Sequence, residues 1–262
     1  MKHLKILRSK GGLKLNKCKE IILGDCLEVM KGIVDGSIDM ILCDLPYNIT
    51  KYPWDILIPF KALWEQYERI IKSNGAIVLF GSQPFTTDLI NSNRKLFKYE
   101  WIWEKTKGGG FALANKMPMK RHENILIFYK KQPIYNPQKT IISKDKIDKR
   151  KNINNPTGSD HIFKGTKLIR KKDDGTRFPQ SVQFFKSVSY KGMHPTEKPV
   201  ALFEYLIKTY TNENDLVLDN CIGSGTTAIA CLNTNRKYIG IEKDEQYYNI
   251  AIDRISGYIH IS

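Results

Sequence analysis

The sequence contains no apolar run that approaches the roughly 20 residues of a membrane-spanning helix. Its basic N-terminal stretch also lacks the apolar centre of a secretory signal peptide. Cysteine is scarce: five residues, with no C-x-x-C pair among them, indicate neither a zinc site nor a disulfide framework. These absences predict a cytoplasmic protein with no membrane partner and no metal site. Four cysteines fall in or beside expected helices and strands, where we interpret them as small packing residues: Cys26, Cys43, Cys221 and Cys231.

Acidic residues are scarce in two parts of this basic chain, whose formal net charge is +15. Residues 1–20 hold seven Lys or Arg and one acidic residue, and residues 130–191 hold 16 Lys or Arg and five acidic residues. The two segments together carry all of the positive excess. Because phosphate neutralisation with counterion release dominates nucleic-acid affinity, this segregation predicts a polyanionic partner. A solvated, lysine-rich surface is the alternative explanation.

The lysine that marks a nucleoside triphosphate site is missing from the one prominent glycine-rich turn. Residues 216–227 read LVLDNCIGSGTT: an apolar run that ends at Asp219, a bend, and a helix-forming segment from Thr226. A P-loop needs Lys before its Ser or Thr, and no Lys follows Gly225. The small residues still let backbone amides approach a bound molecule, and the helix start adds partial positive charge. We therefore expect a polar or anionic ligand at this turn.

A carboxylate after the next predicted strand narrows the ligand. Residues 237–241 form that strand, and Glu242 ends it about 17 residues after the bend. There a carboxylate can accept hydrogen bonds from both hydroxyls of a ribose, so the pattern favours an adenosine derivative. Residues 223–228 also fit the G-x-G-x-x-A pattern of dinucleotide folds, which leaves an NAD-dependent oxidoreductase as a remote alternative. An ordinary strand, turn and helix with no ligand is the other alternative.

A second strand end decides between these candidates. Residues 38–43 form a buried strand that runs directly into Asp44-Leu45-Pro46-Tyr47. Alone, this tetrapeptide is more typical of a plain strand-terminating turn. Together with residues 219–226, it resembles the two hallmark loops of the amino-methylating DNA methyltransferases, which use S-adenosylmethionine to methylate exocyclic base nitrogens. The catalytic loop precedes the cofactor loop here, an order that resembles the permuted β class of that family.

The resemblance implies a catalytic role for each residue of this loop. The exocyclic amine of a base is a poor nucleophile because its lone pair is conjugated into the ring. The Asp44 carboxylate and the main-chain carbonyl beside Pro46 would each accept one N–H of the amine and direct its lone pair at the methyl group. Tyr47 would stack on a base flipped out of the duplex. Leu45 stands where the family usually has Pro. The four predicted catalytic residues are Asp44, Leu45, Pro46 and Tyr47.

The resemblance also implies a set of cofactor-binding residues. Asp25 follows the strand at residues 20–23, where it would accept from the adenine amine of the cofactor; capping of a helix is its alternative role. In residues 194–198, Lys198 would pair with the cofactor carboxylate while His194 and Thr196 donate hydrogen bonds, although a His before Pro is otherwise typical of a turn. The predicted set is Asp25, Cys26, His194, Thr196, Lys198, Asp219, Asn220, Gly223, Ser224, Gly225, Thr226, Thr227 and Glu242.

Seven predicted strands, five of which alternate with helices, indicate an α/β protein of the Rossmann-like methyltransferase type. We expect a seven-stranded, mostly parallel sheet with helices on both faces. Residues 18–130 and 191–258 would form the catalytic and cofactor-binding domain. The basic residues 131–190, which have poor periodicity, would form a target-recognition insertion. The Gly108-Gly109-Gly110 loop with its flanking lysines would either close on DNA or serve as an ordinary connection.

These features predict a site-specific DNA methyltransferase whose partner is DNA. An Asp-led loop resembles adenine-N6 enzymes more than cytosine-N4 enzymes, so adenine is the expected base. Methylation of cytosine N4, methylation of RNA, and a nucleic-acid-binding protein without catalytic activity are the alternatives. A cognate restriction endonuclease and a homodimer are both compatible with the resemblance.

Overall fold

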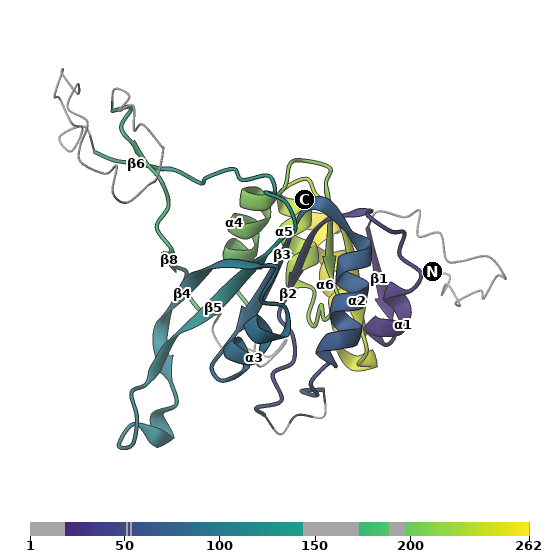
Figure 1. Ribbon diagram of the computed structural model, residues 1–262, viewed down its shortest axis with the longest axis horizontal. Coiled ribbons are helices and arrows are strands. Elements are labelled where there is room, and N and C mark those ends of the chain that lie inside the picture. Colours follow the sequence, from purple (N-terminus) through teal and green to yellow (C-terminus); the bar gives the residue numbers. More distant parts are fainter. Residues whose placement is uncertain (1–18, 51, 53, 144–172, 189–196, 262) are drawn as a thin grey trace. The chain divides into compact units, whose positions relative to one another are not determined.

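The computed structural model describes residues 19–50, 52, 54–143, 173–188 and 197–261 (Figure 1). The chain divides into two compact units. The larger unit comprises residues 1–136 and 181–262, and the smaller one comprises Pro137–Gln180. No helix within the described ranges has both the length and the apolar character needed to span a bilayer.

The larger unit is built on one mixed sheet of eight strands. In spatial order the strands are β1 (Lys19–Leu23), β10 (Lys237–Glu242), β9 (Leu216–Asp219), β2 (Ile38–Cys43), β3 (Ile71–Gly81), β5 (Lys120–Phe128), β4 (Phe97–Gly109) and β8 (Val182–Phe184). The five strands from β1 to β3 in this order are parallel, β5 runs antiparallel to both of its neighbours, and β8 is parallel to β4.

The predicted α/β architecture is confirmed, with one strand more than the seven expected. The additional strand, β8, lies at the edge of the sheet and has only three residues. Residues 181–185 read as a short strand-like piece in the sequence, and both hydrophobic side chains of β8, Val182 and Phe184, are exposed, so the strand adds no apolar side chain to the buried core. Its pairing with Ile102–Glu104 of β4 is what defines it.

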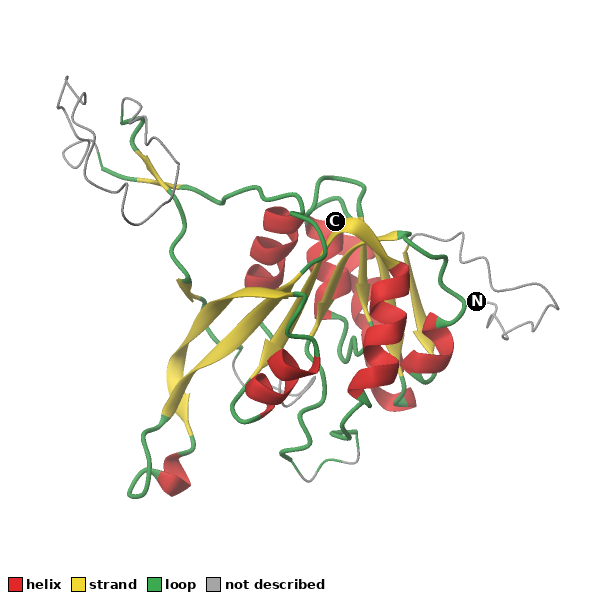
Figure 2. Cartoon of the chain, viewed as in Figure 1, coloured by secondary structure: helices red, strands yellow, loops and turns green. Residues whose placement is uncertain are grey.

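Helices cover both faces of the sheet (Figure 2). Side chains of β2 alternate between them: Ile41 and Cys43 belong to one core cluster, and Met40 and Leu42 to the other. The first cluster contains α1 (Cys26–Met30), α2 (Phe60–Ile70) and α3 (Phe85–Ser92), and the second contains α4 (Val200–Tyr210), α5 (Thr226–Asn233) and α6 (Glu245–Ile261). Each fully buried aliphatic or aromatic side chain contributes about 1.5–3 kcal/mol to this packing.

Two aromatic residues of α2, Trp64 and Tyr67, are part of the core. Leu63, Trp64, Tyr67 and Ile70 lie on its buried face at helical spacing. Tyr67 is fully buried, and its hydroxyl donates a hydrogen bond to the side chain of Asn220 in the glycine-rich turn. The helix therefore holds the glycine-rich turn through this hydrogen bond and also packs in the core.

The parallel strands place four acidic residues at one edge of the sheet. Asp219 and Glu242 are the last residues of β9 and β10, while Asp25 and Asp44 follow β1 and β2. Because β1, β10, β9 and β2 are neighbours and all parallel, their carboxyl ends meet. Asp44 and the glycine-rich turn thus lie at the same edge, as the functional prediction requires.

The described part of the smaller unit contains a two-stranded antiparallel sheet, β6 (Thr140–Ile141) and β7 (Thr176–Arg177). Arg177 donates two hydrogen bonds of 2.8 Å to the carboxylate of Asp173, and Lys139 lies 4.5 Å from the centroid of the Phe178 ring. These contacts join the two strands and the turn before β7.

Candidate active site

A cavity of about 740 Å³ opens at the carboxyl edge of the larger unit. Its size falls within the range of roughly 300–1,000 Å³ typical of small-molecule sites. Its walls come from the segments that follow β1, β2, β9 and β10 and from β4, β5 and the start of α4. Fourteen predicted site residues line it: Asp25, Cys26, Asp44, Leu45, Pro46, Tyr47, Lys198, Asp219, Asn220, Gly223, Ser224, Thr226, Thr227 and Glu242. Gly225 of the predicted set is not among the lining residues.

Asp219 holds the glycine-rich turn in shape. One of its carboxylate oxygens accepts a hydrogen bond of 3.0 Å from the amide of Cys221, and the other accepts one from the hydroxyl of Thr227 at the start of α5. Asp219 is 3% exposed, and burial raises the pKa of its carboxyl to about 6. Asp219 thus connects the glycine-rich turn to the start of α5 through hydrogen bonds.

Two glycines in the turn adopt backbone conformations that other residues rarely accept. Gly223 has φ of +53° and Gly225 has φ of +86°. A Cβ at Gly225 would also lie 3.3 Å from the Cβ of Ala251 in α6. Gly225 is the residue before α5, so its conformation turns the chain into the helix.

Glu242 faces this turn across the cavity wall. Its two carboxylate oxygens accept hydrogen bonds from the amides of Gly223, at 2.8 Å, and Asp244, at 2.9 Å. Burial raises the pKa of Glu242 above its usual value. Each carboxylate oxygen has two lone pairs, so Glu242 keeps capacity to accept hydrogen bonds from a bound hydroxyl.

Asp25 caps the N-terminus of α1 with one of its carboxylate oxygens, the alternative role considered for it from the sequence. That oxygen accepts a hydrogen bond of 3.0 Å from the amide of Leu27, and Lys243 lies 3.4 Å from the other oxygen. The residue lines the cavity, so its predicted contact with a cofactor stays a prediction. His194 and Thr196 lie outside the described residues.

The four-residue loop after β2 combines buried packing with polar contacts. Leu45, which replaces the usual Pro, is 4% exposed and packs in the core with α2 and α3. The Tyr47 ring stacks on Phe85, with 4.7 Å between ring centroids, and its hydroxyl donates a hydrogen bond of 2.6 Å to Asp44. The loop is therefore held by its own core contacts.

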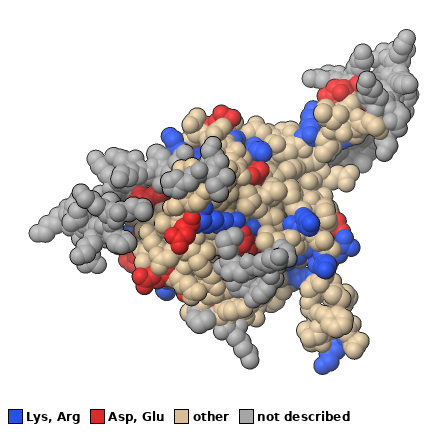
Figure 3. All heavy atoms as spheres, turned by 180° about the vertical axis from the view of Figure 1, so that it is seen from behind, with Lys and Arg blue, Asp and Glu red and all other residues tan. Residues whose placement is uncertain are grey.

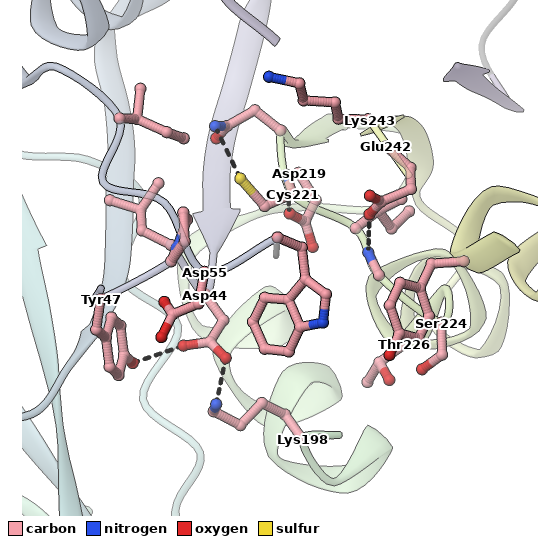
Figure 4. A pocket seen from close by; sticks show the side chains of 18 of the residues that line it. Asp44, Tyr47, Asp55, Lys198, Asp219, Cys221, Ser224, Thr226, Glu242 and Lys243 are labelled. Carbon is pink, nitrogen blue, oxygen red and sulfur yellow. Dashed lines mark hydrogen bonds and ion pairs between the residues drawn. The ribbon is translucent and has the colours of Figure 1, made fainter. Parts of the chain in front are cut away.

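Lys198 contacts the second oxygen of Asp44 and donates a hydrogen bond to it. Figure 4 shows the side chains of Tyr47 and Lys198 pointing at the Asp44 carboxylate, while Glu242 lies farther along the cavity. Lys198 is 7% exposed, and its ammonium lies 5.5 Å from the centroid of the Phe80 ring. The pairing of Lys198 with a cofactor carboxylate stays a prediction, whereas its buried contact with Asp44 is part of the structure.

Glu123 of β5 extends this pair into a chain of alternating charges, a feature that the sequence did not reveal. It lies 3.4 Å from the Lys198 ammonium and also pairs with Lys105 of β4. Residues 123–130 are one of the seven predicted strands, and that pattern places Glu123 only at its beginning. Its position depends on β5 pairing between β3 and β4, which is a tertiary contact.

The charges along this chain set the pKa values of its members. Burial raises the pKa of Asp44, and the nearby Lys198 offsets only part of that rise. Burial alone would lower the pKa of Lys198, but Asp44 and Glu123 together raise it above its usual value. Burial would raise the pKa of Glu123, yet Lys198 and Lys105 hold it below the usual range. Lys198 is therefore a permanent cation between two carboxylates.

Asp55 is a buried acidic residue of the cavity lining that sequence reasoning missed. Its carboxylate accepts hydrogen bonds from three consecutive backbone amides, Asn48, Ile49 and Thr50, at 2.7–2.9 Å, and one from the Thr50 hydroxyl. These bonds hold the pKa of Asp55 below its usual value despite its burial. The segment that follows Tyr47 is thus fixed to the cavity rim. Nearby, Trp54 stacks on Tyr52 with 5.2 Å between ring centroids.

The cysteines near the cavity behave as neutral packing residues. Burial raises the pKa of Cys43 to about 12, and contact with Cys221 together with burial raises the pKa of Cys26. Contact with Cys26 lowers the pKa of Cys221, but contact with Cys43 and burial outweigh that effect and raise it. Among the residues that the structure describes, no group of three or more His, Cys, Asp or Glu side chains is arranged to hold a metal ion.

A family model described as DNA methylase matches residues 38–253 of the chain. Among curated proteins, the chain is 30% identical to the DNA adenine methyltransferase YhdJ of Escherichia coli (strain K12), an alignment that covers 94% of the chain and 86% of the relative. It is 28% identical to the type II methyltransferase M.HpaI of Haemophilus parainfluenzae, over 90% of the chain and 74% of the relative.

Solved structures share the fold. The crystal structure of an M1.HpyAVI-SAM complex matches with a TM-score of 0.61 and 24% identity, and the alignment covers 90% of this chain and 98% of that one. The PvuII DNA methyltransferase, described as cytosine-N4-specific, matches with a TM-score of 0.65 and 17% identity, over 91% of this chain and 86% of that one. At these identities the likeness concerns the arrangement of strands and helices.

Proposed function

From the membership of this chain in the DNA methylase family, we propose that it methylates adenine N6 in DNA with S-adenosylmethionine. The family consists of amino-methyltransferases that act on adenine N6 or cytosine N4. Membership in this family argues against the alternative that the chain is an NAD-dependent oxidoreductase. The observation that carries the proposal is the meeting of Asp44 and the Gly223 turn in one cavity.

The residues of the turn fit S-adenosylmethionine as the methyl donor. Gly223 has no side chain, so a ligand can approach the backbone of the turn closely. The carboxylate of Glu242 keeps lone pairs that can accept hydrogen bonds from the ribose hydroxyls. Asp25 would accept from the adenine amine of the cofactor, while the backbone around Ser224 would face its charged end. Bound there, the cofactor supplies an electrophilic methyl group. His194, Thr196 and Lys198 belong to the same proposal as contacts to its methionine end.

The loop after β2 would orient the amine of the target base. Tyr47 and Lys198 occupy one lone pair on each oxygen of Asp44, so the carboxylate retains acceptor capacity for an N–H of the base. The carbonyl beside Pro46 would accept the second N–H. These two acceptors would pull the nitrogen toward a tetrahedral shape. Since burial raises the pKa of Asp44, its carboxylate is also a better acceptor for the proton released after transfer.

Two features support adenine as the target base. The loop begins with Asp44, and the relative YhdJ is named a DNA adenine methyltransferase. Cytosine N4 is the second candidate, because the family includes both kinds of amino-methyltransferase. An RNA substrate is the third.

We assign target recognition to residues 131–190. They carry much of the positive charge of the chain, which suits contact with phosphates, and Pro137–Gln180 forms a compact unit separate from the catalytic sheet. Within the described part, Arg177 and Lys139 are partly exposed at β6 and β7. A cognate restriction endonuclease and a homodimer remain predictions.

Expression of the gene in a host that lacks DNA methylation tests the proposal. Sequencing of the host DNA with detection of modified bases should find N6-methyladenine at one short recurring sequence and none in the same host with an empty vector. N4-methylcytosine at a recurring sequence would replace adenine by cytosine as the target. Unmodified DNA, with transfer of labelled methyl groups to RNA, would contradict the assignment of DNA as substrate.

A further inference from the structure

The hairpin formed by β4 and β5 extends beyond the other strands of the sheet (Figure 1). Its pairing begins at Phe97 and Phe128 and reaches Gly109 and Lys120. Beyond that pair the chain forms a short 3-10 helix, Phe111–Leu113. We call residues 110–119 the hairpin tip.

The hairpin tip has a folded backbone. The amides of Leu113 and Ala114 donate to the carbonyls of Gly110 and Phe111 at 2.9 and 3.0 Å, and the amide of Met117 donates to the carbonyl of Leu113 at 3.0 Å. Gly110 has φ of +87°, which turns the chain out of β4. The side chains of the tip are therefore presented in a defined arrangement.

That arrangement exposes large apolar side chains. Phe111 is 82% exposed, Met117 is 55% exposed, and Leu113 and Met119 are more than two-fifths exposed. Exposed apolar groups clustered in one short segment are typical of a contact surface, because their exposure to water is unfavourable and a bound partner would remove it. The hairpin tip thus has the character of a binding element.

The charge of the hairpin favours a polyanionic partner. Residues 105–122 contain five Lys or Arg and no Asp or Glu. Lys107 and Lys116 are exposed next to the apolar side chains. On the face drawn in Figure 3, the end of the hairpin carries Lys or Arg and uncharged atoms and no acidic ones. Apolar side chains flanked by cations match a DNA duplex, in which stacked bases lie between phosphates.

The base of the hairpin belongs to the cavity. Trp103, Lys105 and Glu123 line it from β4 and β5. Phe111 lies six positions after Lys105, and six residues span at most about 20 Å at the rise of a strand. That distance corresponds to roughly six base pairs of B-DNA at 3.4 Å each. A duplex bound with its target base in the cavity therefore lies within reach of the hairpin tip.

We propose that the hairpin tip is a second DNA contact, in which Phe111 inserts between stacked base pairs within about six base pairs of the target base. Lys107 and Lys116 contact the flanking phosphates. Insertion of an apolar side chain unstacks a base step and bends the duplex. The inference rests on the proposed function for the identity of the partner, and it adds a device that deforms the DNA.

The test compares Phe111→Ala with Ile259→Ala, a substitution of another exposed apolar residue, on α6 (Ile259 is 58% exposed). We expect Phe111→Ala to weaken duplex binding about tenfold, the size expected for one lost stacking contact. Bending, measured by energy transfer between dyes at the ends of a 30-base-pair duplex of about 100 Å, should fall to the level of free DNA. Affinity for a single strand of the same sequence should stay within about twofold, and Ile259→Ala should match the wild type.

Lys107→Ala with Lys116→Ala separates charge from insertion. This double variant should lower the dependence of log K on log salt by about 1.8, whereas Phe111→Ala should leave that slope unchanged. Wild-type bending in Phe111→Ala, or equal losses on single and double strands, would overturn the proposal. So would conversion of a dimer to a monomer by Phe111→Ala with no change in bending. Bending is measured without a methyl donor, so failure of methyl transfer by the wild type would count against the proposed function alone.

Discussion

The ammonium of Lys198 contacts the carboxylate of Asp44, although the two residues are 154 positions apart in the chain. Lys198 precedes α4, and Asp44 follows β2, so the contact joins two separate parts of the larger unit. The ion pair keeps a permanent cation next to the residue that would hold the target amine. Its geometry gives predictions for both partners and for Glu123.

Replacement of Lys198 by Met should raise the pKa of Asp44 further, because Lys198 is the group that opposes the effect of burial. If transfer requires ionised Asp44, the acidic limb of the pH profile of kcat should move to higher pH. We expect kcat at pH 7 to fall about 10²- to 10³-fold. A buried pair that loses one partner costs about 3–5 kcal/mol of stability, so the thermal midpoint of the variant must be measured alongside. An unchanged acidic limb in a folded variant would argue against the pairing.

Replacement of Glu123 by Gln should shift the same limb in the opposite direction. The negative charge of Glu123 raises the pKa of Asp44, so its removal lowers that pKa and moves the limb to lower pH. We expect kcat to fall about tenfold through misplacement of Lys198. The KM for the methyl donor should change little, because Glu123 is a positioning residue. Shifts of the same sign in Lys198→Met and Glu123→Gln would refute the chain of alternating charges.

Replacement of Glu242 by Gln should weaken cofactor binding with little effect on the chemical step. Gln has one acceptor oxygen, whereas the Glu242 carboxylate accepts from both Gly223 and Asp244. We expect the KM for S-adenosylmethionine to rise about 10- to 100-fold, the effect of losing one or two charge-assisted hydrogen bonds. Asp253→Asn, an exposed carboxylate on α6, is the matched control. A fall in kcat at unchanged KM would place Glu242 elsewhere in the reaction.

Asp219 should make the stability of the protein depend on pH between about 6 and 4. Its pKa is about 6 in the folded state, above the usual 3.8, so protonation favours folding. The free energy of unfolding should therefore rise as pH falls through 6, and the full effect of one group is about 3 kcal/mol. Urea unfolding of the wild type and of Asp219→Asn at pH 7 and pH 5 isolates this contribution. A difference between the two proteins that stays constant with pH would contradict it.

The edge at which the site forms could be predicted from the sequence because it depends on local patterns. Apolar runs that end in Asp44 and Asp219 identify buried strands, and parallel neighbours must present their carboxyl ends together. Glu123 could not be predicted, because its place beside Lys198 depends on β5 inserting antiparallel between β3 and β4. The role of Asp55 was equally hidden, since its hydrogen bonds run to a loop without periodicity.

The most direct test of the account is methyl transfer by Asp44→Ala, measured together with cofactor binding. Transfer of labelled methyl groups from S-adenosylmethionine to duplex DNA should fall at least about 10³-fold. Isothermal titration should give a Kd for the cofactor within about threefold of the wild type, because Asp44 orients the base and leaves the Gly223 turn intact. Near-normal transfer by this variant, or loss of cofactor binding as large as the loss of transfer, would contradict the account.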